Sequence, residues 1–212
     1  MFFWLCWLVV APFVFLFFPT RIIGKRNIKK IKKKSAIIAP NHQSGLDPVI
    51  IKARVDTSCK LMAKDSMFKK AFPRWVLTRF GAYPVNRGGN DITAVKTTLG
   101  HLKNNKHIVI FPEGTRVNTG DLAELKNGLV MFALKTDCYV VPSLFRKKPK
   151  FLRFNRLLID IPFKFSDYEE FKGVKINHEV LDRASQILSE KIQYLKEVDI
   201  KEFKKRIKKG VC

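Results

Sequence analysis

A chain of 212 residues is long enough for one folded domain with a buried core. Hydrophobic residues make up 46% and aromatic residues 12% of the chain, which excludes an intrinsically disordered protein. Lysine and arginine number 41 against 18 aspartate and glutamate, a formal net charge of +23. This charge indicates a polyanionic partner, either nucleic acid or an anionic membrane with acidic substrates. The 4 cysteines show no CxxC spacing, which argues against a zinc site and a disulfide framework.

The N-terminal segment from Met1 to Phe18 contains no charged side chain. As a helix it would reach about 27 Å, slightly less than the ~30 Å hydrocarbon core of a bilayer, and Pro12 would kink it. It lacks the basic start and small-residue cleavage site of a signal peptide. Its many phenylalanines and tryptophans suit lipid better than a small protein core, although a buried core helix is the alternative. We therefore expect residues 1–24 to form a helical membrane-anchoring segment that either spans the bilayer or lies in it.

A basic run follows this segment, because Lys25 to Lys34 reads KRNIKKIKKK. Basic residues that flank an apolar anchor stay on the cytoplasmic side and attract anionic headgroups. A solvated charge run is the alternative, but the position directly after the anchor favours membrane contact. The pattern predicts a protein at the cytoplasmic face of a membrane, and the short, lysine-rich chain suggests a bacterial inner membrane.

Downstream, short apolar runs alternate with helical patterns, which predicts an α/β domain at residues 25–200. We expect a largely parallel or mixed sheet flanked by helices. The expected strands are the apolar runs 36–39, 61–63, 82–85, 107–111, 139–141 and 157–161. The expected helices are 92–102, capped by Asn90 and Asp91, then 129–134 and 181–195. The basic C-terminal tail, residues 201–212, is either an amphipathic helix at the membrane or a solvated terminus.

The stretch NHQSGLDP, residues 41–48, directly follows the first expected strand of this domain. His42 and Asp47 cannot share one helix face, but a turn at Gly45 would bring the carboxylate back against the imidazole. The carboxylate would then fix the ring tautomer and stabilise the imidazolium, leaving the other ring nitrogen to take a proton from a hydroxyl. A substrate hydroxyl would make a Ser or Cys nucleophile unnecessary. Taken alone this spacing is weak, and a histidine hydrogen-bonded in a turn is the commoner explanation.

Two further stretches place arginines after expected strands. FPEGTR, residues 111–116, contains a glycine turn whose backbone N–H groups, with Arg116, would form an anion cradle. Glu113 would either hydrogen-bond a polyol or simply pair with Arg116. The strand at 82–85 leads to Arg87, a residue type suited to bidentate phosphate binding, although a lone arginine after a strand is usually just surface.

Together these stretches resemble the conserved blocks of the glycerolipid acyltransferases, and within that family the bacterial-type 1-acyl-glycerol-3-phosphate acyltransferases. The resemblance covers roughly residues 20 to 165, and four ordered blocks rarely arise by chance. One departure is Asn86, which stands where the family more often has aspartate. The matching blocks are NHxSxxD at 41–47, the strand and arginine at 82–87, FPEGTR at 111–116 with Lys126 and Gly128 after it, and Val-Val-Pro at 140–142.

The resemblance implies transfer of a fatty acyl group from acyl-CoA or acyl-carrier protein to the sn-2 hydroxyl of 1-acyl-glycerol-3-phosphate, which makes phosphatidic acid. It implies no metal and no cofactor. Its implied partners are a lysophospholipid, the acyl donor and an anionic membrane surface, with no nucleic acid. The implied site residues are His42 as general base, Asp47 holding its ring, Lys64 and Gly114 at the oxyanion, and Arg87, Glu113 and Arg116 on phosphate and glycerol.

Three alternatives stay open at this point. A related enzyme would acylate glycerol-3-phosphate or a lyso-ornithine lipid instead. A non-enzymatic nucleic-acid-binding protein would spread cations and aromatics over one surface, whereas here they bracket an apolar anchor. A membrane-surface scaffold would have lost the chemistry, and the intact His42, Asp47 and Glu113 argue against it.

Overall fold

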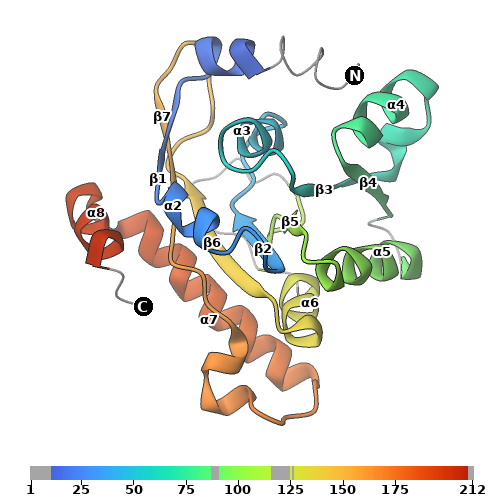
Figure 1. The fold of residues 1–212 in the computed structure, drawn as a ribbon, viewed down its shortest axis with the longest axis vertical. Coiled ribbons are helices and arrows are strands. Elements are labelled where there is room, and N and C mark those ends of the chain that lie inside the picture. The colour runs from blue at the N-terminus through green and yellow to red at the C-terminus, as the bar shows by residue number, and fades with distance from the viewer. Residues whose placement is uncertain (1–10, 87–90, 116–124, 126, 210–212) are drawn as a thin grey trace.

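The computed structural model describes residues 11–86, 91–115, 125 and 127–209 of the chain (Figure 1). These residues form a seven-stranded sheet in the order β1-β7-β6-β2-β5-β3-β4. Neighbouring strands are parallel except for β6 and β7, so β1 and β7 run opposite to the other strands. The predicted α/β fold with a mixed sheet is confirmed.

Strands and helices alternate along most of this chain. The strands are β1 (Thr20–Ile23), β2 (Ala36–Pro40), β3 (Lys60–Lys64), β4 (Ala82–Val85), β5 (His107–Val109), β6 (Tyr139–Phe145) and β7 (Asn155–Ile159). The α-helices are one at residues 11–17 and α2 (Lys25–Lys30), α3 (Asp47–Arg54), α4 (Ala71–Arg79), α5 (Ile92–Lys103), α6 (Gly128–Thr136), α7 (His178–Glu197) and α8 (Ile200–Lys209). The 3₁₀ helices are η1 (Asp65–Phe68), η2 (Phe165–Asp167) and η3 (Glu169–Phe171).

Helices cover both faces of the sheet, which is why the central strands are continuous apolar runs rather than alternating ones (Figure 1). Successive residues of β2 serve opposite faces. Ile37 packs into the core formed with α5, α6, α7 and α8, while Ile38 packs into the core formed with helix 11–17, α2 and α3. Two hydrophobic layers on one sheet fix the register of β2, and hence the position of the loop that follows it.

Several strand boundaries differ from the predicted ones. β5 ends at Val109 instead of continuing through residue 111, because the chain there enters the turn that closes with the Gly114 N–H on the Phe111 carbonyl oxygen. β6 extends to Phe145 and β7 begins at Asn155, because the two strands pair as a hairpin beyond the apolar runs.

The predicted helices are found as α5, α6 and α7. Asp91 caps α5 as expected, because its carboxylate accepts the Ala94 N–H at 2.8 Å.

The two ends of the described chain pack into the domain. β1 is an edge strand paired with β7, and Phe203 of α8 is fully buried in the core. The tail was expected to be a helix at the membrane or a solvated terminus, and the structure instead shows a helix with one face packed on the protein. The division of the chain at residues 24 and 200 stays a prediction.

The predicted membrane anchor falls partly outside the described residues, which begin at residue 11. Within the described ranges, no helix combines the length and the apolar character needed to cross a bilayer.

Candidate active site

The loop after β2 brings His42 and Asp47 together. His42 Nδ1 lies 3.1 Å from Asp47 Oδ2, and this oxygen also accepts the backbone N–H groups of Gln43 at 2.7 Å and Ser44 at 2.6 Å. The turn through Gly45 ends where α3 begins at Asp47, so the predicted contact is confirmed. With the proton on Nδ1, the ring donates to the carboxylate and presents Nε2 as a base.

Three contacts fix this loop against its neighbours. The amide of Asn41 pairs with the backbone of Phe145 in β6, donating to its carbonyl oxygen at 3.2 Å and accepting its N–H at 2.7 Å. The Glu113 carboxylate accepts the backbone N–H of His42 at 3.0 Å, and the His42 ring stacks on Phe111 with centroids 4.0 Å apart. Sequence reasoning named Asn41 only as part of a motif and missed this bracing role.

Glu113 is buried and lies beneath the loop that carries His42. Burial raises the pKa of its carboxyl group, while the hydrogen bond from the His42 backbone and the charge of that ring act in the opposite direction. From the sequence, Glu113 was expected to hydrogen-bond a polyol or to pair with Arg116. The structure adds a hydrogen bond from the His42 backbone that neither prediction included. Arg116 and Arg87 lie outside the described residues, as does Lys126, so their phosphate role stays a prediction.

Gly114 and Lys64 were the candidates for stabilising an oxyanion. Gly114 has φ +68, a conformation that favours glycine, and its N–H donates to the carbonyl oxygen of Phe111 at 3.0 Å. That donor is engaged inside the turn, and an oxyanion role for the backbone N–H groups near Gly114 stays a prediction. Lys64 ends β3 and lines the cavity beside His42, and its role at an oxyanion stays a prediction.

A cavity of about 590 Å³ opens beside the His42 ring. His42 and Lys64 are its polar lining side chains, and most of the apolar lining is supplied by α3, β3, β4, η1 and α4. Its volume lies within the usual range for small-molecule sites. The apolar lining residues are Pro48, Val49, Leu61, Met62, Ala63, Met67, Val76, Leu77, Phe80, Ala82 and Phe111.

The chain belongs to the acyltransferase family, whose model matches residues 20–146, more than half of the sequence. Among curated relatives, the chain is 31% identical over 168 residues to the 1-acyl-sn-glycerol-3-phosphate acyltransferase of Borreliella burgdorferi, covering 70% of this chain and 64% of that protein. It is 30% identical over 146 residues to the enzyme of that name from Saccharomyces cerevisiae, covering 64% of this chain and 47% of that protein. The chain therefore spans less than two thirds of the length of these relatives.

The fold also matches a solved structure, the 1-acyl-sn-glycerophosphate (LPA) acyltransferase PlsC from Thermotoga maritima. The TM-score is 0.67 at 24% sequence identity, and the match covers 91% of this chain and 80% of that one. At this identity the likeness establishes the shared fold, whose sheet and helices position the loop after β2.

Proposed function

We propose that the chain transfers a fatty acyl group from acyl-CoA or acyl-carrier protein to the sn-2 hydroxyl of 1-acyl-glycerol-3-phosphate, which makes phosphatidic acid for phospholipid biosynthesis. The observation that carries the proposal is the buried His42–Asp47 pair at the mouth of an apolar cavity. The names of the relatives support the choice of a phosphate-bearing acceptor.

In the proposed reaction His42 acts as general base. Nε2 takes the proton of the sn-2 hydroxyl while the hydroxyl oxygen attacks the thioester carbonyl carbon, and the carbonyl electrons move onto its oxygen. When the tetrahedral intermediate collapses, the carbon–sulfur bond breaks, the ester forms, and the leaving thiolate takes the proton back from the imidazolium. Asp47 stabilises the charged ring in between. General base catalysis of this kind contributes about 10²–10⁴-fold to the rate.

Other groups around His42 would orient the substrates. Lys64 would stabilise the oxyanion, which is worth about 10²–10³-fold for one well-placed donor. Arg87 and Arg116 would hold the substrate phosphate. Glu113 would keep the His42 loop in place and lie near the glycerol. The apolar cavity would take an acyl chain, because its lining offers no polar partner along most of its length.

Membrane association is supported by an exposed apolar surface near the active site, here called the aromatic face. It consists of helix 11–17 and the tip of the β6–β7 hairpin, residues 151–154. The rings of Phe17 and Phe151 stack with centroids 5.2 Å apart, and the Leu152 N–H donates to the Phe17 carbonyl oxygen at 2.7 Å. The large apolar side chains that this face exposes are Phe13, Phe15, Leu16, Phe151, Leu152 and Phe154, at 49% to 67% of their surface.

The aromatic face lies at the sheet edge that carries His42. β2 runs parallel to β6 with Pro40 opposite Ser143, so the hairpin tip begins just beyond Phe145, where Asn41 is hydrogen-bonded. The hairpin is also basic, with lysines at 147, 148 and 150 and Arg153. Apolar side chains rimmed by cations suit an anionic bilayer. A site at this edge would meet a lysolipid at the cytoplasmic face of the membrane.

The test is an acyl-transfer assay on the full chain purified in detergent. Labelled acyl-CoA and acyl-carrier protein are offered with 1-acyl-glycerol-3-phosphate, glycerol-3-phosphate and a lyso-ornithine lipid as acceptors. We expect labelled phosphatidic acid from the first acceptor, in greater yield than product from the other two. Product from another acceptor alone would keep the acyltransferase and change its substrate. No transfer with any combination would refute the proposed function.

A further inference from the structure

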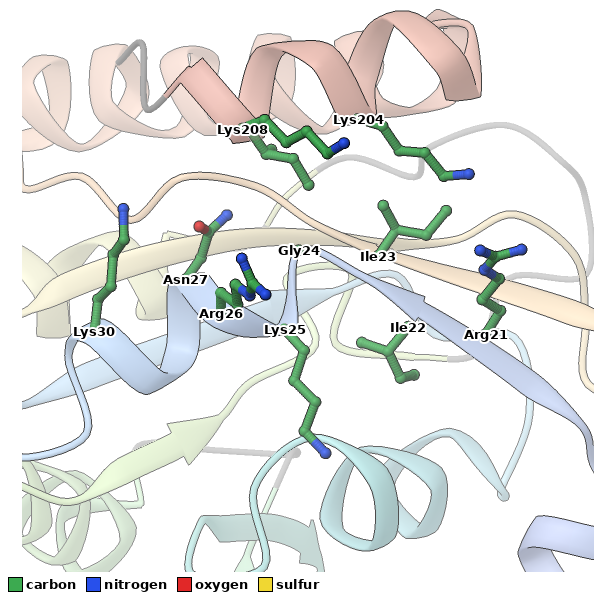
Figure 2. A pocket seen from close by; sticks show the side chains of 11 residues that line it. Arg21, Ile22, Ile23, Gly24, Lys25, Arg26, Asn27, Lys30, Lys204 and Lys208 are labelled. Carbon is green, nitrogen blue, oxygen red and sulfur yellow. The ribbon is translucent and has the colours of Figure 1, made fainter.

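A second cavity, of about 600 Å³, lies between β1, the start of α2 and the C-terminal helix α8 (Figure 2). None of its described lining residues is acidic. Figure 2 shows Lys204 and Lys208 extending from α8 toward β1, whereas Lys25 points away toward α3. Burial, with the charges of Lys29 and Arg54, lowers the pKa of Lys25 on that side. The cations that border the space between the two walls are Arg21, Arg26, Lys30, Lys204 and Lys208.

The cavity lined by these five cations is here called the basic cavity, and no described acidic residue neutralises them. None of them forms an ion pair within the described part of the chain, although other basic residues do. Arg206, on the same helix α8, pairs with Asp160 at 2.9 Å, and Lys164 pairs with Asp137 at 2.6 Å. Like charges gathered in a concave site focus the electrostatic field and raise the local concentration of anions.

Both walls of the basic cavity are fixed to the end of β7. On the α2 side, the Asn27 side chain donates to the carbonyl oxygen of Ile159 at 3.2 Å. Gly24 packs so closely there that an added Cβ would lie 2.0 Å from that same oxygen. On the other side, Arg206 binds Asp160, the residue after β7, and Phe203 is fully buried. The backbone elements that carry these cations are therefore fixed to one another by the fold, and the cations line one cavity.

We propose that the basic cavity binds a small polyanion that carries phosphate groups. Arg21 and Arg26 offer planar guanidinium groups that bind phosphate oxygens bidentately, and the lysines add point charges. Several uncompensated cations call for a ligand with several negative charges, and the volume suits a small molecule. A phosphorylated lipid headgroup and a soluble phosphate ester share this chemistry. The inference does not depend on the proposed reaction, because no residue of the basic cavity lines the cavity beside His42.

The test compares two double variants of the full chain in detergent at low salt. R26E/K208E reverses one exposed charge on each wall, and K103E/K135E makes the same change in net charge at exposed sites on α5 and α6. Inorganic tripolyphosphate is the probe, measured by titration calorimetry. We expect R26E/K208E to bind it roughly tenfold more weakly than wild type, or worse, and K103E/K135E to stay within about twofold. Because the catalytic edge also carries cations, the difference between the two variants is the measured effect.

Thermal unfolding keeps this comparison interpretable. Tripolyphosphate should raise the Tm of wild type and of K103E/K135E more than that of R26E/K208E, since a ligand stabilises the folded state that binds it. If R26E/K208E does not fold, the neutral pair R26Q/K208Q replaces it. Equal affinity and equal Tm shifts in all three proteins would overturn the proposal.

Vesicle binding separates the two sources of the phosphate. Phosphatidylcholine vesicles containing phosphatidic acid are compared with vesicles of matched surface charge containing phosphatidylserine. A lipid headgroup as the ligand predicts that R26E/K208E loses its preference for phosphatidic acid while K103E/K135E keeps it. A soluble ester predicts loss of tripolyphosphate binding with the same vesicle binding in both variants.

Discussion

The described chain contains two His–Asp pairs with buried imidazole rings, at opposite edges of one sheet. His42 and Asp47 lie just beyond the carboxyl end of β2, with Nδ1 and Oδ2 3.1 Å apart. His107 begins β5, and its Nδ1 lies 2.6 Å from Asp56 Oδ2. β2 and β5 are parallel neighbours, so the two pairs mark the two ends of the same pair of strands.

The pair at the amino edge has both ring nitrogens engaged. His107 Nε2 lies 3.1 Å from the carbonyl oxygen of Ile31, and its side chain is 2% exposed. Burial opposes charge on this ring, but the hydrogen bond and charge of Asp56, with the Ile31 oxygen, raise the pKa of His107. Burial likewise opposes charge on Asp56, yet hydrogen bonds from His107 and Ser58 hold the pKa of Asp56 at about 2. Two acceptors around one ring favour the imidazolium and leave neither ring nitrogen for a substrate hydroxyl.

The pair at the carboxyl edge differs in access rather than in residue type. Asp47 binds one ring nitrogen of His42, and the ring borders the cavity of about 590 Å³. No described residue hydrogen-bonds the other nitrogen. A His–Asp pair can transfer a proton to or from a substrate only where the second ring nitrogen is left for a substrate hydroxyl. This difference supports the proposed role of His42 as general base and a structural role for His107.

The largest expected effect is that of His42→Ala on acyl transfer. Removing the proposed general base should lower turnover by about 10²–10⁴-fold, while the Tm changes little because the ring borders a cavity. The matched control, His107→Ala, should lower the Tm and leave the turnover of the folded fraction intact. A His42→Ala enzyme that keeps more than about a tenth of wild-type turnover would contradict the proposed mechanism.

Asp47→Asn should reduce turnover strongly, though less completely than His42→Ala. The His42 ring can still lie in the loop, but a neutral amide does not stabilise the imidazolium. The negative charge at Asp47 Oδ2, which three N–H donors contact in the wild type, is also lost. The pH–rate profile is the decisive measurement. A variant that loses turnover with no change in the profile would assign Asp47 to the loop's structure alone.

The two pairs also show what the sequence reveals about a site. His42 and Asp47 are five positions apart in one loop, so a glycine turn was enough to predict their contact. His107 and Asp56 are 51 positions apart and belong to no motif, so only the folded sheet brings them together. The same holds for the bond from the His42 backbone to Glu113, which joins residues 71 positions apart.

The fold shows the same contrast between local patterns, which the sequence reveals, and contacts between distant residues, which it does not. Strands buried on both faces are short apolar runs, and the sequence located β2 to β7 by them, with errors at their ends. It missed β1, because Thr20–Ile23 continues an apolar segment and its partner β7 comes far later in the chain. Composition predicted neither the closure of α8 onto the core by Phe203 nor the basic cavity beside it, because both depend on which residues meet in space.

His107→Gln sharpens the comparison through stability. Glutamine cannot carry the positive charge, so the partly buried Asp56 carboxylate keeps only its Ser58 donors. The free energy of unfolding should fall by roughly 2–3 kcal/mol, as for other buried charges that lose a partner. Urea unfolding at neutral pH measures it, with His178→Gln, at an exposed pair on α7, as a control that should change little. Equal effects of the two variants would contradict the structural role of His107.

The pH dependence of stability gives the next test. Because the folded-state pKa of Asp56 is about 2, below its ordinary 3.8, its contribution is present above pH 3.8 and is lost as the pH falls toward 2. Because the folded-state pKa of His107 is raised above 6.5, its contribution is present below pH 6.5 and declines as the pH rises through the folded value. The difference in free energy of unfolding between wild type and His107→Gln should therefore be largest between about pH 3.8 and pH 6.5. Urea unfolding at a series of pH values measures this difference. A difference that does not vary with pH would refute the ion pair.

The smallest expected effect concerns the aromatic face, through which the carboxyl edge is proposed to meet lipid. Phe151 and Phe154 are more than half exposed, so F151S/F154S should leave the Tm nearly unchanged. Each ring transferred from water to the bilayer interface is worth roughly 1 kcal/mol, so losing both rings should weaken binding to anionic vesicles by about thirtyfold. Val174→Ser removes an exposed apolar side chain from another part of the surface and should leave vesicle binding unchanged.

The residual binding of F151S/F154S should become more sensitive to salt, because with less apolar burial a larger share of the binding free energy comes from the cations of the hairpin, which salt screens. Equal vesicle binding by F151S/F154S and Val174→Ser would remove the hairpin tip from the membrane-facing surface and leave helix 11–17 as its remaining apolar element.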